Sequence, residues 1–167
     1  GNHSNDAGTE YNVNDTTAKY ICFKNEQKKD SIYTHSTSSS SEEVTVTEAG
    51  TYMIFYAVRT DNLDDNRFVA EAAIYHQPSG GSYTERDYTR ATSYSRGSGG
   101  SGVYDFDIQL NFAGALELGA GDKIKLGVKQ NDADDSSDTV RVQKDGTMLT
   151  MVRVAKTGNK ASIISVS

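Results

Sequence analysis

Alternation of apolar and polar residues is the strongest pattern along the chain. In YDFDIQLNF (104–112) aromatic or aliphatic side chains alternate with Asp, Gln or Asn, and KIKLGVK (123–129) repeats the pattern with lysines on its polar side. A period of two predicts a β-strand with one buried face and one solvated face. The glycine-rich AGALELGAGD (113–122) between them is predicted to be a connection.

Two other segments are apolar on both faces of the predicted strand. In TYMIFYAVR (51–59) one face carries Tyr52, Ile54, Tyr56 and Val58, and the other carries Met53, Phe55 and Ala57. In TMLTMVRV (147–154) the faces are Met148, Val152 and Val154 on one side and Leu149 and Met151 on the other. Such strands usually lie between two layers. We expect another subunit to supply the second layer; the alternative is an ordinary core strand of a monomer.

The remaining periodic segments complete an all-β pattern. Further strands are predicted at 19–24, 43–47, 67–76, 83–95 and 139–143, with a turn at 144–146 that closes the last onto 147–154. The segment VAEAAIYH (69–76) could also form a helix, but its β-branched and aromatic flanks favour a strand. The chain is therefore predicted to form an antiparallel β-sandwich or jelly roll.

Four stretches resemble the tumour necrosis factor/complement C1q superfamily of jelly rolls. They are TEAGTYMIFYAVR (47–59), FVAEAAIYHQ (68–77), LELGAGDKIKLGV (116–128) and GTMLTMVRV (146–154). The last is similar to the closing strand of bacterial and viral members. The aromatic-Ser-Gly-Phe ending of vertebrate members is not present, and KTGNKASIISVS (156–167) extends beyond the family's usual last strand.

The resemblance implies a homotrimer whose inner sheets pack around a three-fold axis. We expect Tyr52, Tyr56, Leu149 and Met151 to form that contact. The resemblance covers residues 18–155, the jelly roll, and so separates a polar N-terminal arm (1–17) from a C-terminal extension (156–167).

Composition and charge exclude several classes of function. The formal net charge of −6 argues against a nucleic-acid binder, which needs clustered Lys and Arg. Cys22 is the single cysteine, so no intrachain disulfide can form. No stretch approaches the ~20 apolar residues of a membrane-spanning helix, so membrane insertion is not expected.

The negative charge is concentrated in NDADDSSD (131–138) and DNLDDNR (61–67). The first segment carries Asp132, Asp134, Asp135 and Asp138. It does not match an EF-hand, because Ser137 and Gln143 stand where that loop needs Gly and Glu. If the strands alternate in direction, both acidic segments leave one pole of the sandwich.

In some C1q-like members the corresponding loop binds calcium near the three-fold axis. Calcium is therefore the candidate cation for these aspartates, although no cofactor is required. An acidic contact patch and a plain solvated loop remain alternatives.

The segment SYTERDYTRATSYSRG (82–97) interleaves tyrosines with arginines. Tyr and Arg are enriched at recognition surfaces. The candidate face for a protein receptor or a cell-surface glycan comprises Tyr83, Arg86, Tyr88, Arg90, Tyr94 and Arg96. On one continuous strand all of these except Tyr83 would share a side. The alternative is a polar outer face on which Glu85 and Asp87 neutralise the arginines.

The sequence contains no recognisable catalytic motif. His3, His35 and His76 are scattered, and no nucleophile and base are paired in sequence. We therefore expect a non-enzymatic homotrimeric knob on the surface of a phage virion, as a head spike, capsid decoration or fibre tip. The N-terminal arm would attach it to a capsid or stalk protein. The virion setting follows from analogy with such members rather than from a residue. The alternative is a carbohydrate- or receptor-binding module on an extracellular or spore surface.

Overall fold

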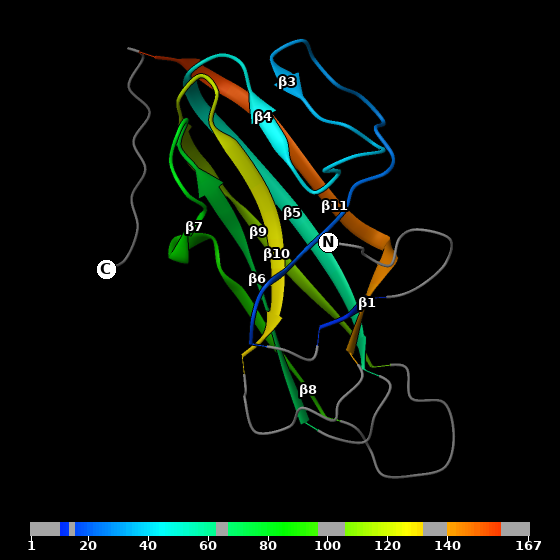
Figure 1. Cartoon of the computed structure of the whole chain (residues 1–167). Helices are drawn as coiled ribbons and strands as arrows, with labels where there is room; N and C mark the ends of the chain where they lie inside the picture. Colours follow the sequence, from blue (N-terminus) through cyan, green and yellow to red (C-terminus); the bar gives the residue numbers. More distant parts are fainter. Residues whose placement is uncertain (1–10, 14–15, 63–66, 97–105, 132–139, 158–167) are drawn as a thin grey trace.

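The computed structural model describes residues 11–13, 16–62, 67–96, 106–131 and 140–157. They form two antiparallel sheets that face each other (Figure 1). The four-stranded sheet has the order β1 (Tyr11–Asn12), β11 (Val140–Lys156), β5 (Gly50–Asn62) and β9 (Phe106–Leu118). No helix in this part of the chain is long and apolar enough to cross a membrane.

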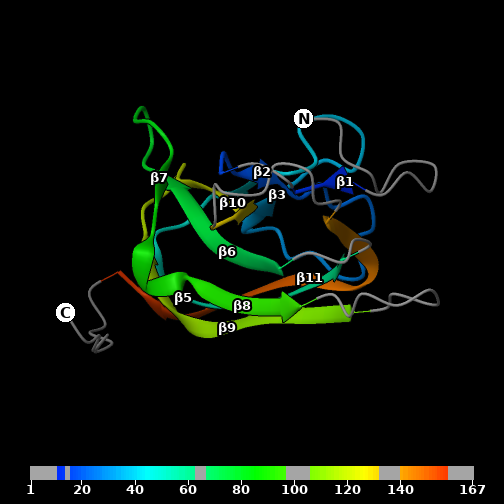
Figure 2. The same ribbon diagram turned by 90° about the horizontal axis from the view of Figure 1, so that it is seen from below.

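The seven-stranded sheet covers the opposite side of the core. Its order is β3 (Tyr33–Thr34), β4 (Val44–Val46), β10 (Lys123–Gln130), β6 (Arg67–Gln77) and β7 (Thr84–Glu85). In addition, β2 (Lys19–Tyr20) pairs with β10, and β8 (Ala91–Arg96) pairs with β6. A short 3-10 helix, η1 (Asp87–Thr89), lies between β7 and β8. Seen from below, β8 lies beside β9 and closes one side of the sandwich (Figure 2).

The core lies between the sheets and is centred on β5. Tyr52, Ile54, Tyr56 and Val58 all point inward and are buried. The Tyr56 hydroxyl lies 2.9 Å from the carbonyl oxygen of Ala72 and 2.6 Å from that of Thr89, so it links β5 to β6 and η1. Its burial raises the pKa of Tyr56, because the charged phenolate is disfavoured away from water.

The alternating strands are confirmed, but the connection predicted at 113–122 is restricted to residues 119–122. Ile108 and Leu110 are buried while Gln109 and Asn111 are exposed, as the pattern predicts. The strand β9 continues to Leu118 and pairs with β5 along its whole length. Gly114 pairs with Ile54 within the strand, and glycine is required there because a Cβ would overlap with the Phe112 ring.

The turn predicted at 144–146 is instead a bulge within the single long strand β11. Both halves of β11 pair with β5, and the register shifts between Gln143 and Met148. Gly146 has a φ of +87°, which glycine adopts without strain. The Thr147 hydroxyl donates to the carbonyl of Gln143 (2.5 Å) and accepts from the backbone N–H of Arg59 (3.1 Å). Within the bulge, the Thr147 hydroxyl thus supplies the acceptor for this backbone N–H of β5.

Other predicted segments can be compared with the observed strands. The segment at 67–76 is a strand, β6, rather than a helix. The strand predicted at 83–95 is divided into β7, η1 and β8. Three residues of the predicted N-terminal arm belong to the fold, since Tyr11 and Asn12 pair with β11 and Val13 is buried in the core.

The turn between β9 and β10 is fastened by Asp122. Its carboxylate accepts hydrogen bonds from the N–H groups of Gly119 (2.8 Å) and Ser79 (2.9 Å) and lies 2.7 Å from His76 Nε2. Arg86 Nε donates to His76 Nδ1 (3.1 Å). Because arginine can only donate, Nδ1 must be the acceptor. Nε2 therefore carries the ring proton and donates a hydrogen bond to Asp122. Burial acts to raise the pKa of Asp122, but these hydrogen bonds outweigh it and the pKa lies below its ordinary value.

Replacing Asp122 should therefore destabilise the fold. We expect Asp122→Ala to lower the free energy of unfolding by about 3 kcal/mol, because three donors lose their acceptor. Urea titration at pH 7 and fixed protein concentration measures the loss. The matched control, Asp145→Ala at an exposed position of the β11 bulge, should stay within about 0.5 kcal/mol of the wild type. Equal effects of the two substitutions would contradict the role of Asp122.

Candidate functional site

The structure does not place the predicted tyrosine and arginine positions on one strand face. Because η1 interrupts the segment, Tyr83 and Arg86 precede the break and Tyr88 lies within it. The Tyr83 hydroxyl donates to Glu43 (2.6 Å), and Arg86 donates to His76. Of the predicted set, Arg90 and Tyr94 remain on a common side at β8, and the side chain of Arg96 lies outside the described residues.

An ion-pair network crosses the outer face of the seven-stranded sheet. The carboxylate of buried Glu71 lies 2.9 Å from Arg90 Nε and 3.0 Å from Lys129 Nζ. The same two cations contact Glu85, at 2.5 Å and 2.9 Å, and Arg90 also reaches Asp87 at 3.1 Å. Acidic neighbours thus neutralise Arg90, as the alternative interpretation of this segment predicts.

The pKa of the Glu85 carboxyl is strongly lowered within this network. Burial acts to raise its pKa, but hydrogen bonds from Arg90, Lys129 and Tyr75 outweigh that effect and lower the pKa of Glu85 to about 2. The Tyr75 hydroxyl donates to Glu85 at 2.8 Å. Glu85 therefore stays ionised throughout the physiological pH range and keeps the network assembled.

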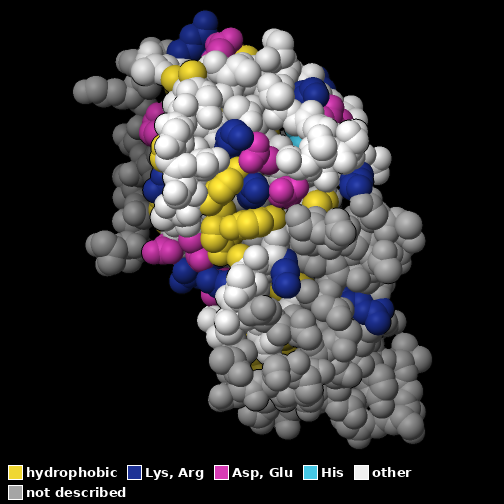
Figure 3. Space-filling view, in the orientation of Figure 1, with side chains coloured by type: hydrophobic (Ala, Val, Ile, Leu, Met, Phe, Trp, Pro, Cys, Tyr) yellow, Lys and Arg dark blue, Asp and Glu magenta, His cyan; other side chains and the backbone are white. Residues whose placement is uncertain are grey.

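A cluster of tyrosines adjoins the network over β10. The Lys125 ammonium lies 5.0 Å from the ring centre of Tyr20 and 4.6 Å from that of Tyr83. Tyr20 meets Tyr75 edge to face at 5.3 Å, and the Tyr75 ring lies over Gly127, where no Cβ obstructs it. Figure 3 shows hydrophobic side chains enclosed by basic and acidic ones on this face. These side chains therefore pack against one another.

The outer face of the four-stranded sheet is different, because its centre is apolar. Opposite residues of antiparallel strands share a face. The register places Phe55 beside Ala113 and Thr150, Ala57 beside Asn111 and Met148, and Met53 beside Ala115 and Val152. We call the face formed by Met53, Phe55, Ala57, Ala113, Ala115, Met148, Thr150 and Val152 the apolar face.

Large side chains of the apolar face are open to solvent in the single chain. Phe55 is 40% exposed, Met148 52% and Val152 49%. Val154, further along β11, is also exposed. Contiguous exposed apolar surface of this kind marks interaction sites in soluble proteins.

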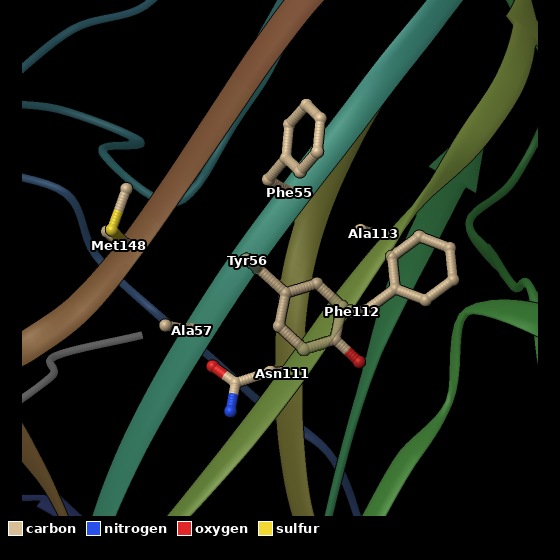
Figure 4. Close-up of a pocket in the computed structure, with 7 residues that line it drawn as sticks. All are labelled: Phe55, Tyr56, Ala57, Asn111, Phe112, Ala113 and Met148. Atoms are coloured by element: carbon tan, nitrogen blue, oxygen red, sulfur yellow. The ribbon is translucent and has the colours of Figure 1, made fainter.

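A shallow depression of about 300 Å³ lies within the apolar face. It is lined by Phe55, Tyr56, Ala57, Asn111, Phe112, Ala113 and Met148. Figure 4 shows Phe55 and Met148 extending from adjacent strands, with the short side chains of Ala57 and Ala113 between larger neighbours. The face therefore combines protruding apolar side chains with a recess.

The predicted contact residues share one face, but that face is the inner one. Tyr52 is 0% and Tyr56 3% exposed, and Leu149 and Met151 pack against the same core. Their side chains are therefore not available to another subunit. One physical reason is that the Tyr56 hydroxyl needs a buried acceptor, which the opposite sheet supplies. The exposed set is the opposite one, and it contains Phe55, Met148 and Val152.

A sequence signal for the correct face was present. The face with Tyr52 and Tyr56 continues into Val58, whereas the face with Phe55 continues into Arg59. On the partner strand, Thr150 stands between Met148 and Val152. Polar residues interrupt the outer set on both strands, which is typical of a face that is solvated in part.

The acidic positions Asp132, Asp134, Asp135 and Asp138 lie outside the described residues, as do residues 63–66. The flanking strand ends lie together: Val140 is opposite Asn62, and Gln130 is opposite Ala70. Within the described ranges no three His, Cys, Asp or Glu side chains could hold a metal ion together. Calcium at the acidic segment stays a prediction.

The lowered pKa of Glu85 generates a pH-dependent prediction. The folded pKa of about 2 lies below the unfolded value, so the stabilisation is complete above about pH 5 and is lost as the pH falls towards 2. We expect Glu85→Gln to lower the free energy of unfolding by about 1–2 kcal/mol at pH 7, allowing for solvent screening. Urea titrations from pH 7 to pH 2 should show the difference between variant and wild type shrinking below pH 4.5. A difference independent of pH would contradict the assignment.

Comparison with known proteins places the fold. No family model matches the chain, and no curated protein sequence matches it. Among solved structures, it is similar to Eiger TNF from S. frugiperda, with a TM-score of 0.52 and 16% identity over 79% of this chain and 74% of that one. It is also similar to murine APRIL at pH 8.0, with a TM-score of 0.58 and 14% identity over 87% of this chain and 92% of that one. At these identities the likeness shows the fold alone: the protein is an antiparallel jelly roll of the tumour necrosis factor type.

Proposed function

We propose that the protein is a non-catalytic homotrimeric knob whose three copies meet through the apolar face. The exposure of Phe55, Met148 and Val152 on one sheet is the observation that carries the proposal. Burying such side chains between subunits is favourable by about 25 cal/mol for each Å² of apolar surface removed from water. The outer face of the opposite sheet has less need of such cover, because its charged side chains over β6 and β10 pair with one another.

The shape of the apolar face suits a cyclic assembly. In a ring of three, each contact is heterologous, so a projection of one copy meets a different patch of the next. Phe55 and Met148 provide projections, while Ala57 beside Met148 and Ala113 beside Phe55 contribute small side chains to the recess. The number three itself comes from the resemblance to the tumour necrosis factor/C1q superfamily.

The described side chains support a non-enzymatic role. His35 lies 2.7 Å from Glu26 and 2.9 Å from the carbonyl of Ser41, so both of its ring nitrogens are engaged. His76 is held between Asp122 and Arg86. Cys22 is buried, with its Sγ 4.0 Å from Glu42. Neither histidine contacts a hydroxyl or thiol that it could activate among these contacts.

The proposed setting is the surface of a phage virion, as a head spike, capsid decoration or fibre tip. An extracellular or spore surface is the alternative. This part of the proposal is supported by the resemblance of GTMLTMVRV (146–154) to bacterial and viral jelly rolls. Because residues 11–13 belong to the fold, attachment to a capsid or stalk protein is assigned to the residues that precede them.

Light scattering on the purified chain tests the assembly. We expect a mass three times the 18.1 kDa of one chain, and a shift to the monomer mass in Phe55→Glu, because a charge would be buried in the contact. Ala113→Arg, which fills the recess from an exposed position, should have the same effect. The matched control is Tyr94→Glu on the other sheet, which should stay trimeric. A wild type of 18.1 kDa, or two variants that remain trimeric, would overturn the proposal.

A further inference from the structure

An exposed strip runs along the outer side of β8. Side chains of successive strand residues alternate between the two faces of a sheet. Ser95 is buried, whereas Thr92 and Tyr94 are exposed, and Arg90 lies at the extended residue that precedes the strand. We call Arg90, Thr92 and Tyr94 the β8 strip. It belongs to the seven-stranded sheet, so the proposed trimer contact does not use it.

Tyr94 stands apart from the other tyrosines of this sheet. Tyr20, Tyr75 and Tyr83 pack against one another or against Lys125. Tyr94 is 53% exposed, directly opposite Val69 on β6. An aromatic ring that is half exposed beside polar groups offers a flat apolar surface to a ligand.

The charges at the Arg90 end of the strip nearly cancel, because two cations share three carboxylates and leave one net negative charge. Arg90 and Lys129 are shared among the carboxylates of Glu71, Glu85 and Asp87. Such a cluster attracts neither a polyanion nor a polycation strongly, which favours an uncharged partner. Its polar atoms remain accessible, since the Arg90 side chain is partly exposed and that of Asp87 largely so.

The network also holds this part of the surface in place. Arg90 contacts three carboxylates at once, so its guanidinium is fixed before any ligand arrives. Groups that are already ordered lose little conformational entropy on binding. The strip therefore offers a stacking ring, a hydroxyl at Thr92 and fixed charged donors and acceptors along one side of a strand.

We propose that the β8 strip binds a neutral saccharide. The C–H face of one pyranose ring would stack on Tyr94, its hydroxyl groups would exchange hydrogen bonds with Thr92, and the next sugars of an oligosaccharide lying along β8 would reach Arg90 and Asp87, because a strand rises about 3.3 Å per residue. A protein partner fits less well, because the exposed neighbours of Tyr94 along the strip are polar rather than apolar. The saccharide site itself is independent of the proposed trimer. Only its avidity rests on that proposal, since three strips would engage a glycan-coated surface together.

An array of neutral, sialylated and sulfated glycans, probed with the full chain, tests this proposal. We expect neutral glycans to bind, with little change between 50 mM and 500 mM NaCl, because no charged group of the ligand takes part. Titration calorimetry with the best neutral glycan of the array then compares variants. Tyr94→Ala should weaken binding about tenfold, and Tyr94→Phe, which keeps the ring, should stay within about threefold of the wild type.

Tyr88 supplies the matched control. It is 47% exposed, almost as much as Tyr94, but it lies on η1 rather than on β8. Tyr88→Ala should therefore leave glycan affinity unchanged. Binding restricted to sialylated or sulfated glycans, equal losses in Tyr88→Ala and Tyr94→Ala, or no binding to any glycan would overturn the proposal. If the protein is a trimer but binds no glycan, only the saccharide proposal is contradicted. If it is a monomer that binds neutral glycans, only the trimer proposal is contradicted.

Discussion

The strand β5 imposes the constraint on which the rest of the structure depends, because both of its faces are apolar. Tyr52, Tyr56 and their neighbours fill the space between the two sheets. Phe55 and the other outward side chains then remain on the surface of the single chain. The partner strand β11 repeats this arrangement, with Leu149 turned inward and Met148 outward. A monomer satisfies one side of these strands and leaves the other for a further layer.

The outer faces of the two sheets differ in how far their side chains pair with one another. On the seven-stranded sheet, charged and aromatic side chains satisfy one another through Glu71, Glu85, Arg90 and Lys129. On the four-stranded sheet, alanines and exposed large apolar side chains surround a recess. This contrast is the reason why we propose assembly through the four-stranded sheet and ligand binding on the other.

Local periodicity was sufficient to predict the fold class and the principal strands. It also placed Tyr52, Tyr56, Leu149 and Met151 on a common face, which the register confirms. It could not decide which face looks inward, because that depends on what the opposite sheet offers, such as the carbonyls that accept from Tyr56. Bulges and breaks were also missed. Gly114 lies within a strand, where a glycine leaves room for the Phe112 ring, and η1 interrupts a segment whose sequence alternates like a strand.

The central claim is that the apolar face is covered by other copies of the chain. Oxidation of Met148 by dilute hydrogen peroxide, followed by mass spectrometry, tests this cover directly, because Met148 is half exposed in the single chain. The account predicts that Met148 is oxidised much more slowly than free methionine in concentrated protein and faster on dilution. Oxidation of Met148 at the rate of free methionine, at every protein concentration, would contradict it.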